Sequence, residues 1–130
     1  MLHITSLFAA LLALLIIFLA YKVVTFRQKK KVGIGDAGDK GGQLAIRAHA
    51  NALEYIPMLL ILMGMYEVNG GSSLVLYIIG SLIVIARIIH AMGLSRSAGT
   101  SFGRFYGTLI TWIMTITLAG LNIYRFIIQM

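Results

Sequence analysis

Four long apolar stretches alternate with short polar segments along this chain. Each stretch comes close to or exceeds the roughly 20 apolar residues that a helix needs to cross a bilayer. The predicted membrane spans cover approximately residues 3–26, 43–66, 73–92 and 103–128. Because the segments between them are short, we expect an antiparallel four-helix bundle. The pattern therefore predicts an all-α integral membrane protein with residues 1–130 in a single domain.

The composition agrees with a membrane protein and removes one kind of chemistry. Of the 130 residues, 59% are hydrophobic and 12% are charged, and the mean hydropathy is +0.91. A soluble domain carries about 25% charged residues. The chain has no cysteine, so any thiol chemistry must use the sulfur of a co-substrate. The histidines show no metal-ligand spacing, and we expect no metal.

The net charge of +7 reflects membrane topology rather than binding to nucleic acid, because the basic residues lie beside the apolar stretches. The first loop, RQKKKVGIGDAGDKGG, is rich in lysine and arginine, the second, EVNGGS, has neither, and the third holds Arg96 and Arg104. Basic loops stay on the cytoplasmic side of a membrane. We therefore expect the first and third loops in the cytoplasm, and both termini outside.

The second span begins with polar residues, in the sequence AIRAHANALEYIP. With about 100° per residue, Arg47, Asn51 and Glu54 share one face of a helix. Tyr55 flanks this face and His49 points away from it. A charge at the centre of a bilayer costs at least ~2.5 kcal/mol, so such side chains face the interior of a bundle, where they find partners. This face is the first candidate for a functional site.

The residues alone leave two interpretations of this face open. In the first, the charges only hold the bundle together, with Arg47 paired to Glu54 through Asn51, or with Glu54 paired to Arg87 of the third span. In the second, the face lines a cytoplasmic site to which Arg87 and His90 also contribute, since they are three residues apart. Such a site has more arginines than acids, since Arg47, Arg87, Arg96 and Arg104 accompany the single acid Glu54. It suits a small anionic ligand, and Glu54 can bind an amine of that ligand.

An Arg-Ala pair, an Asn, a Glu-Tyr pair and a Pro occur together in RAHANALEYIP, as Arg47, Ala48, Asn51, Glu54, Tyr55 and Pro57. This pattern resembles the signature of the membrane-associated proteins in eicosanoid and glutathione metabolism, the family of microsomal glutathione transferases and leukotriene C4 synthase. The segments ARIIH and SRSAGTSFGRFYGT also fit, so the resemblance covers most of the chain. The chain is similar to the short prokaryotic branch, which implies a bacterial inner membrane.

The resemblance implies a homotrimer that binds glutathione between its subunits, near the cytoplasmic side. By position, the residues that would bind the tripeptide from one subunit are Arg47, Asn51, Glu54, Tyr55, Arg87 and His90. His49 and Arg27 match positions that reach the glutathione of the neighbouring subunit. Arg104 matches the arginine that stabilises the thiolate in catalytic members, with a shift of about one residue in its spacing from His90.

Three positions depart from the family pattern. Gln43 and Leu44 replace a Glu-Arg pair before the signature arginine, and Leu94 stands where several active members have a tyrosine. These departures concern the rate of catalysis more than binding.

Three functional hypotheses follow. The first is a membrane glutathione transferase or peroxidase that acts on a lipophilic electrophile or hydroperoxide from the bilayer, with Arg104 stabilising the thiolate. The second, which Leu94 favours, is a non-catalytic protein that binds glutathione or a lipid. The third is a structural bundle whose charges only pair with one another. Glutathione should stabilise a protein that binds it, which separates the third hypothesis from the others.

Overall fold

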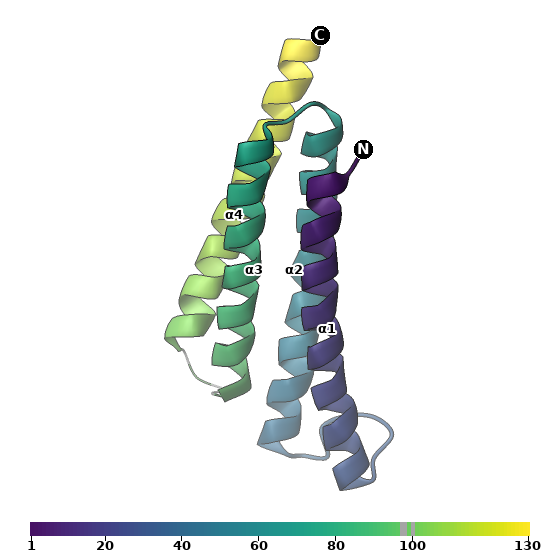
Figure 1. Cartoon of the computed structure of the whole chain (residues 1–130). Helices are drawn as coiled ribbons and strands as arrows, with labels where there is room; N and C mark the ends of the chain where they lie inside the picture. The colour runs from purple at the N-terminus through teal and green to yellow at the C-terminus, as the bar shows by residue number, and fades with distance from the viewer. Residues whose placement is uncertain (97–98, 100) are drawn as a thin grey trace.

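The computed structural model describes residues 1–96, 99 and 101–130, apart from the side chain of Arg96. Its helices are α1 (His3–Lys30), α2 (Lys40–Val68), α3 (Ser73–Arg96) and α4 (Phe102–Gln129). They run alternately up and down, with both termini and the α2–α3 turn at one end and the α1–α2 loop at the other (Figure 1). All four helices are long and apolar enough to cross a membrane. The predicted all-α four-helix membrane fold is therefore confirmed.

The helices extend beyond the apolar stretches because polar residues and turns determine where they end. α1 continues past residue 26 until the left-handed backbone of Lys31 (φ 55°) ends it. α2 begins at Lys40 rather than at residue 43, since the Asp39 carboxylate accepts hydrogen bonds from N–H groups of its first turn. Hydropathy reports the part of a helix that lies in lipid, so it does not reveal these ends.

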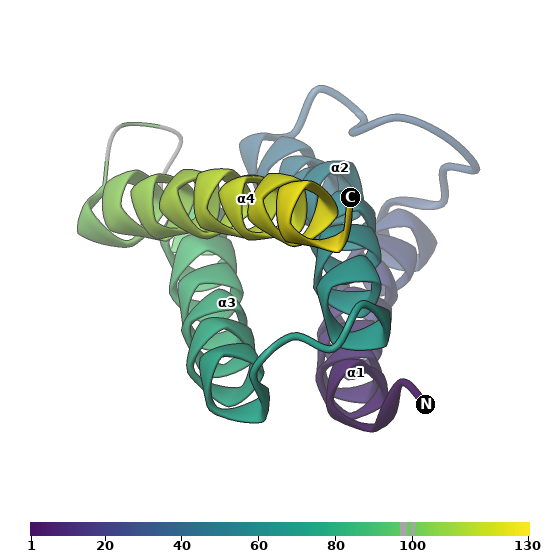
Figure 2. The same ribbon diagram turned by 90° about the horizontal axis from the view of Figure 1, so that it is seen from above.

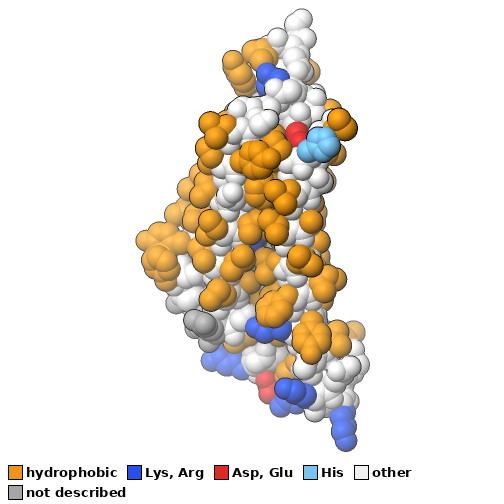
Figure 3. All heavy atoms as spheres, in the orientation of Figure 1, with side chains coloured by type: hydrophobic (Ala, Val, Ile, Leu, Met, Phe, Trp, Pro, Cys, Tyr) orange, Lys and Arg blue, Asp and Glu red, His pale blue; other side chains and the backbone are white. Residues whose placement is uncertain are grey.

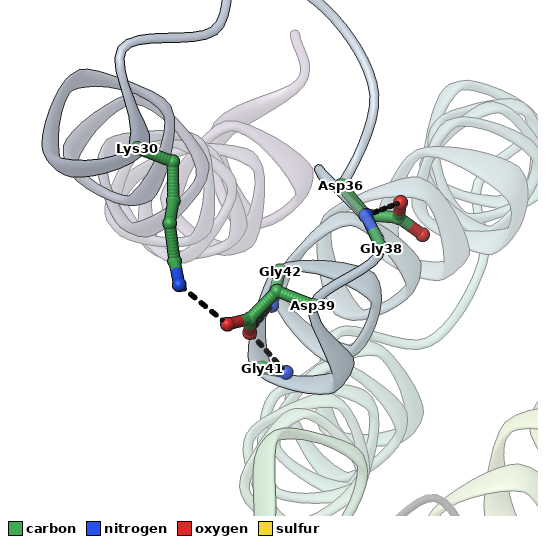
Figure 4. Close-up of polar contacts among 6 residues, drawn as sticks. All are labelled: Lys30, Asp36, Gly38, Asp39, Gly41 and Gly42. Carbon is green, nitrogen blue, oxygen red and sulfur yellow. Dashed lines mark hydrogen bonds and ion pairs between the residues drawn. The ribbon is translucent and has the colours of Figure 1, made fainter.

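Asp39, at the end of the α1–α2 loop, forms polar contacts with both α1 and α2 (Figure 4). The Lys30 ammonium lies 2.8 Å from one Asp39 oxygen, and the other oxygen accepts from the N–H groups of Gly41 at 2.8 Å and Gly42 at 3.1 Å. The hydrogen bond from Lys30, followed by those from the glycine N–H groups, lowers the pKa of Asp39 below its ordinary value of 3.8. The carboxylate therefore remains charged at any physiological pH.

Helices α2 and α3 form the middle of the bundle, and α1 and α4 each pack against both of them (Figures 1 and 2). The core contains buried apolar side chains from all four helices: Leu12, Leu19, Ile56, Leu59, Met63, Leu76, Ile83 and Leu118. Many other apolar side chains face outward and cover the lateral surface, whereas lysines and arginines gather at the end with the α1–α2 loop (Figure 3). This distribution suits a protein whose lateral surface is surrounded by lipid.

α4 approaches α3 closely because glycines lie where the two helices meet. A Cβ atom on Gly107 would lie 2.6 Å from the His90 Cβ and 2.8 Å from the Ala86 carbonyl oxygen. A Cβ atom on Gly103 would lie 2.5 Å from the Ile89 carbonyl oxygen. Membrane helices associate through close van der Waals packing, which small residues permit. The α3–α4 contact therefore depends on the absence of a side chain at these two positions.

At the end with the termini, Glu67 of α2 caps the first turn of α1. Its carboxylate accepts hydrogen bonds from the N–H groups of Ile4 at 2.9 Å and Thr5 at 2.7 Å. The first N–H groups of a helix lack partners within the helix and carry partial positive charge, so a carboxylate stabilises them. In the α2–α3 turn, the Asn69 carbonyl oxygen accepts from Arg125 Nε of α4 at 2.8 Å. Side chains of separate helices thus hold this end together.

Replacing Glu67 by glutamine should lower the free energy of unfolding by roughly 1–2 kcal/mol, because the charge at the end of α1 is lost and only one acceptor oxygen remains. Thermal unfolding in detergent measures the change. Val68→Ala, at the adjacent exposed position, is the control and should melt close to the wild type. Equal melting temperatures for Glu67→Gln and wild type would show that this cap contributes no stability.

Acid should weaken the α1–α2 connection through Asp39. Because folding lowers its pKa, its contribution to stability is complete above the carboxyl pKa of the unfolded chain and is lost as the pH falls through the lower pKa of the folded state. The melting temperature of the wild type should therefore decline below about pH 4. Asp39→Asn keeps an acceptor for the helix cap but carries no charge, so its melting temperature should fall less over the same pH range. Parallel pH profiles for the two proteins would contradict this expectation.

Candidate functional site

A cleft of about 760 Å³ lies at the basic end of the bundle, between the start of α2, the end of α3 and the start of α4. This volume falls in the range of about 300–1,000 Å³ that is usual for ligand pockets. The residues that line it are Gln43, Leu44, Arg47, Asn51, His90, Leu94, Gly99, Arg104, Phe105, Thr108, Leu109 and Trp112. Three helices therefore contribute to one site.

Each helix turns one face toward the cleft. α2 and α3 contribute residues about one turn apart, and α4 contributes Arg104, Thr108 and Trp112 at intervals of four, together with Phe105 and Leu109. The side chain of Ser101 accepts a hydrogen bond from the Arg104 N–H at 3.3 Å and so begins α4 at the rim of the cleft. This cap places Arg104 in the first turn of α4.

The cleft carries positive charge. Arg47 and Arg104 line it, and none of the lining residues that the structure describes is acidic. α2 and α4 begin at this end of the bundle and α3 ends there, so two positive helix ends and one negative helix end border the cleft and its net positive charge comes from the arginines (Figure 1). Arg104 Nη1 donates to the Gly99 carbonyl oxygen at 2.7 Å, which orients its guanidinium. These charges favour an anionic ligand. Within the described ranges, no three His, Cys, Asp or Glu side chains gather as a metal ion would require.

Glu54 joins Arg47 and Asn51 at the border of the cleft. Arg47 Nη2 lies 3.5 Å from Glu54 Oε1, and Asn51 Nδ2 donates to Glu54 Oε2 at 3.5 Å. The predicted shared face of α2 is thus confirmed. The Arg47 and Glu54 side chains are 56% and 50% exposed, so this ion pair contributes only about 0–1 kcal/mol. Glu54 pairs with Arg47 rather than with Arg87, and both partners stay accessible to a ligand.

Arg87 lies behind the wall of the cleft and is 1% exposed. Its Nη2 donates to Asn51 Oδ1 at 2.6 Å and lies 3.2 Å from His90 Nδ1, and its Nη1 donates to Thr111 Oγ1 at 3.4 Å. The guanidinium carbon is 5.5 Å from the centre of the Tyr55 ring, which is close enough for a cation–π interaction. A single buried cation therefore connects α2, α3 and α4.

A hydrogen bond between α4 and α2 lies deeper in the bundle than the two cleft arginines. Trp112 Nε1 donates to the Tyr55 hydroxyl oxygen at 3.1 Å. Trp112, Phe105 and Leu109 line the cleft, yet each remains at least one-third exposed at the surface. The cleft thus has a polar part near the basic end and an apolar flank that continues onto the lateral surface.

Comparisons with known proteins relate this architecture to a family. The model of the MAPEG family, the membrane-associated proteins in eicosanoid and glutathione metabolism, matches residues 5–124. The chain belongs to the MAPEG family. It is 38% identical over 90 residues to the inner membrane protein YecN of Escherichia coli strain K12, and equally to YecN of E. coli O6:H1 strain CFT073. Each alignment covers 69% of this chain and 69% of the relative. The resemblance first seen in the second span is confirmed for nearly the whole chain.

The structure brings together four residues that the MAPEG signature led us to expect at a glutathione site, namely Arg47, Asn51, His90 and Arg104. Glu54 and Tyr55 border the cleft through their contacts with these residues and with Trp112. Arg87 was expected to line the pocket as well, but its guanidinium supports the wall from behind. Arg96 is a further basic residue expected here, and its side chain lies outside the described part of the chain.

Arg27 and His49 do not line this cleft. Arg27 Nε donates to the Gly35 carbonyl oxygen at 3.3 Å in the α1–α2 loop. His49 is half-buried, two residues after Arg47 and so about 200° from it around α2. These are the two positions for which the MAPEG resemblance implies contact with a neighbouring subunit, and that role stays a prediction.

Sequence reasoning missed the contribution of α4 to the site. Trp112 was not among the predicted site residues, yet it lines the cleft and donates a hydrogen bond to Tyr55. Thr108 also lines the cleft, and Thr111 holds Arg87. All three lie one or two turns after Arg104, so extending its helical face along α4 would have found them.

Gly107→Ala should separate α4 from α3 and disturb the cleft between them. Its Cβ atom would meet the backbone of Ala86 and the His90 Cβ, neither of which can move freely, so we expect a loss of about 1–3 kcal/mol of stability. Gly120→Ala is a matched control in the same helix, because a Cβ atom there meets nothing within 4 Å. It should leave stability unchanged or raise it slightly, since alanine favours helix over glycine. Thermal unfolding that ranks the two variants equally would contradict the close α3–α4 packing.

Proposed function

We propose that this MAPEG protein binds glutathione in the cleft and uses its sulfur on lipophilic compounds, as a membrane glutathione transferase or peroxidase. The observation that carries the proposal is a cleft whose described lining includes two arginines and no acid, bordered by one half-exposed carboxylate and flanked by exposed apolar side chains. Glutathione has two carboxylates, one ammonium and one thiol. Its charges therefore complement those of the site.

Each polar group of the site has a matching group on the tripeptide. Arg47 suits a carboxylate, which a guanidinium binds with two parallel hydrogen bonds. Glu54 suits the ammonium group, and it is held next to Arg47. Arg104 suits the sulfur, because a guanidinium in the first turn of a helix favours a thiolate over a thiol. Asn51 and His90 can form hydrogen bonds with the peptide groups of the ligand that lie between its carboxylate, its ammonium group and its sulfur.

The thiolate acts as the nucleophile in this proposal. In conjugation, the sulfur attacks an electrophilic carbon, a C–S bond forms and the leaving group departs with its electron pair. In peroxide reduction, the sulfur attacks the outer oxygen of a hydroperoxide and the alkoxide takes a proton to leave as an alcohol. A second glutathione then displaces water from the oxidised sulfur and forms the disulfide. The apolar flank of Phe105, Leu109 and Trp112 gives such substrates a route from the bilayer.

The proposal includes a homotrimer in the bacterial inner membrane, with the basic end in the cytoplasm. The name of the E. coli relatives supports the membrane, and the lysines and arginines at the end with the cleft support the orientation. Glutathione is a cytoplasmic thiol, so a cleft at this end would be exposed to its substrate. In a trimer, Arg27 and His49 would approach the cleft of a neighbouring subunit.

A protein that binds glutathione without turnover is the second candidate. Leu94 favours it, because this side chain lines the cleft and is buried where several active members carry a tyrosine hydroxyl. A purely structural bundle is the third candidate. In such a bundle the Arg47–Glu54 pair would serve only to stabilise α2. A half-exposed ion pair contributes little to stability, which speaks against this candidate.

Titration of glutathione into the detergent-purified protein separates these candidates. We expect saturable growth of thiolate ultraviolet absorbance, which Arg104→Ala abolishes while binding weakens only modestly. Arg47→Ala should weaken binding by about tenfold or more, because a charge-assisted pair with a carboxylate is lost. Lys29→Ala removes an exposed cation of the same end that does not line the cleft, and should leave both readouts unchanged.

The remaining outcomes decide against the enzyme. Binding without thiolate in the wild type would identify a binding protein. No thermal stabilisation at millimolar glutathione would exclude glutathione as the ligand and leave the structural candidate. An equal loss of binding in Lys29→Ala and Arg47→Ala would show that net charge, rather than the cleft, attracts the tripeptide.

A further inference from the structure

The buried guanidinium of Arg87 can only donate hydrogen bonds, and this constrains every group around it. Arginine has five N–H donors and no acceptor. Three of its neighbours can either donate or accept hydrogen bonds. The Asn51 amide and the Thr111 hydroxyl have both kinds of group, and the proton of a neutral His90 ring can be on either nitrogen. Within hydrogen-bond reach of Arg87, each of them must therefore present an acceptor to it.

For His90 this requirement selects one tautomer. Its Nδ1 lies 3.2 Å from Arg87 Nη2, so Nδ1 must hold a lone pair rather than a proton. A neutral imidazole whose Nδ1 is an acceptor carries its proton on Nε2. His90 is 4% exposed and lines the cleft, so the ring offers an N–H at Nε2 on the side away from Arg87.

For Asn51 the same requirement fixes the orientation of the amide. Its Oδ1 accepts from Arg87 Nη2 at 2.6 Å, so its NH2 group points away from Arg87, toward the cleft border where it donates to Glu54. Thr111 differs from the other two, because its hydroxyl already donates one hydrogen bond and accepts another within the protein. It accepts from Arg87 and donates to the Gly107 carbonyl oxygen at 2.6 Å, and it does not line the cleft.

We infer that Arg87 is a positioning residue that makes the inner wall of the cleft a surface of hydrogen-bond donors. It does not touch the ligand. It holds His90 as the Nε2–H tautomer and Asn51 with its NH2 group outward, so that both donate to the ligand. The wall consequently selects a ligand whose inner groups are acceptors, such as carboxylates, carbonyls or a thiolate, and His90 serves as a donor rather than as a base. This inference rests on the proposed glutathione site for its ligand, but its geometry is independent of any ligand.

Nitrogen NMR of protein labelled with 15N-histidine tests the geometry without a ligand. The chain has three histidines, and the signals absent from His90→Gln identify those of His90. At about pH 8, where an ordinary imidazole is neutral, we expect His90 to show a single tautomer with a bare, hydrogen-bonded Nδ1 and a protonated Nε2. A proton on Nδ1, or a rapidly averaged pair of tautomers as expected for exposed His3, would overturn the inference.

Two variants separate positioning from packing. Arg87→Met replaces the guanidinium by an apolar chain, so His90 should lose its Nδ1 hydrogen bond and change its spectrum. Glutathione affinity should fall by about tenfold or more, as two donors of the wall lose their orientation. Thr111→Val also removes a hydrogen bond from Arg87, but not one that faces the cleft. Its His90 spectrum should match the wild type and its affinity should change less than about threefold.

The outcomes distinguish this inference from the proposed function. If wild-type His90 shows the expected tautomer but glutathione does not bind, the glutathione proposal fails and the donor wall stands. If glutathione binds and Arg87→Met leaves both the His90 spectrum and the affinity unchanged, Arg87 is only a packing residue and the inference fails. If Arg87→Met does not fold, the wild-type spectrum alone decides, since its tautomer is measured without any substitution.

Discussion

A guanidinium buried in a membrane bundle needs acceptors for its N–H groups, and Arg87 draws on three helices to supply them at the basic end of the molecule. Its Nη1 and Nη2 have partners on α2, α3 and α4, while its Nε has none among the described residues. A shift of any two of these helices against each other would therefore leave a further buried donor unpaired. Such a donor would cost about 1–3 kcal/mol, and more because it is charged. The demand explains why Asn51 and Thr111, which are poor residues for a lipid-facing helix, occur inside two apolar spans.

The bilayer as a solvent accounts for the remaining pattern of polar groups. Polar side chains gather at the two ends of the bundle, where they cap helices, and in the small interior network around Arg87. The core between them is apolar and depends on close packing, because lipid gives apolar helices little reason to associate. Gly103 and Gly107 let α4 lie directly on α3. This close contact is also what brings Thr111 within reach of Arg87.

The cleft combines these two environments in one place. It offers arginines near the basic end, and an apolar flank of Phe105, Leu109 and Trp112 that continues onto the lateral surface. A water-soluble anion and a lipid-soluble partner could therefore meet without either leaving its own phase. Membership in the MAPEG family is consistent with such a meeting point. Because Leu94 lines the cleft without a hydroxyl, the proposed function relies for polar contacts on Arg104 and on the wall that Arg87 supports.

The four helices, their alternating direction and the shared face of Arg47, Asn51 and Glu54 could be predicted from the sequence. These follow from bilayer thickness and from the helical period, which are local properties of a segment. The position of Arg87 behind the wall, and the contact between Trp112 and Tyr55, which are separated by 57 positions in the chain, follow only from the packing of the helices. The helical period states which residues share a face but not which neighbouring helix that face meets. That choice depends on how α3 and α4 pack, and therefore on contacts between residues distant in sequence.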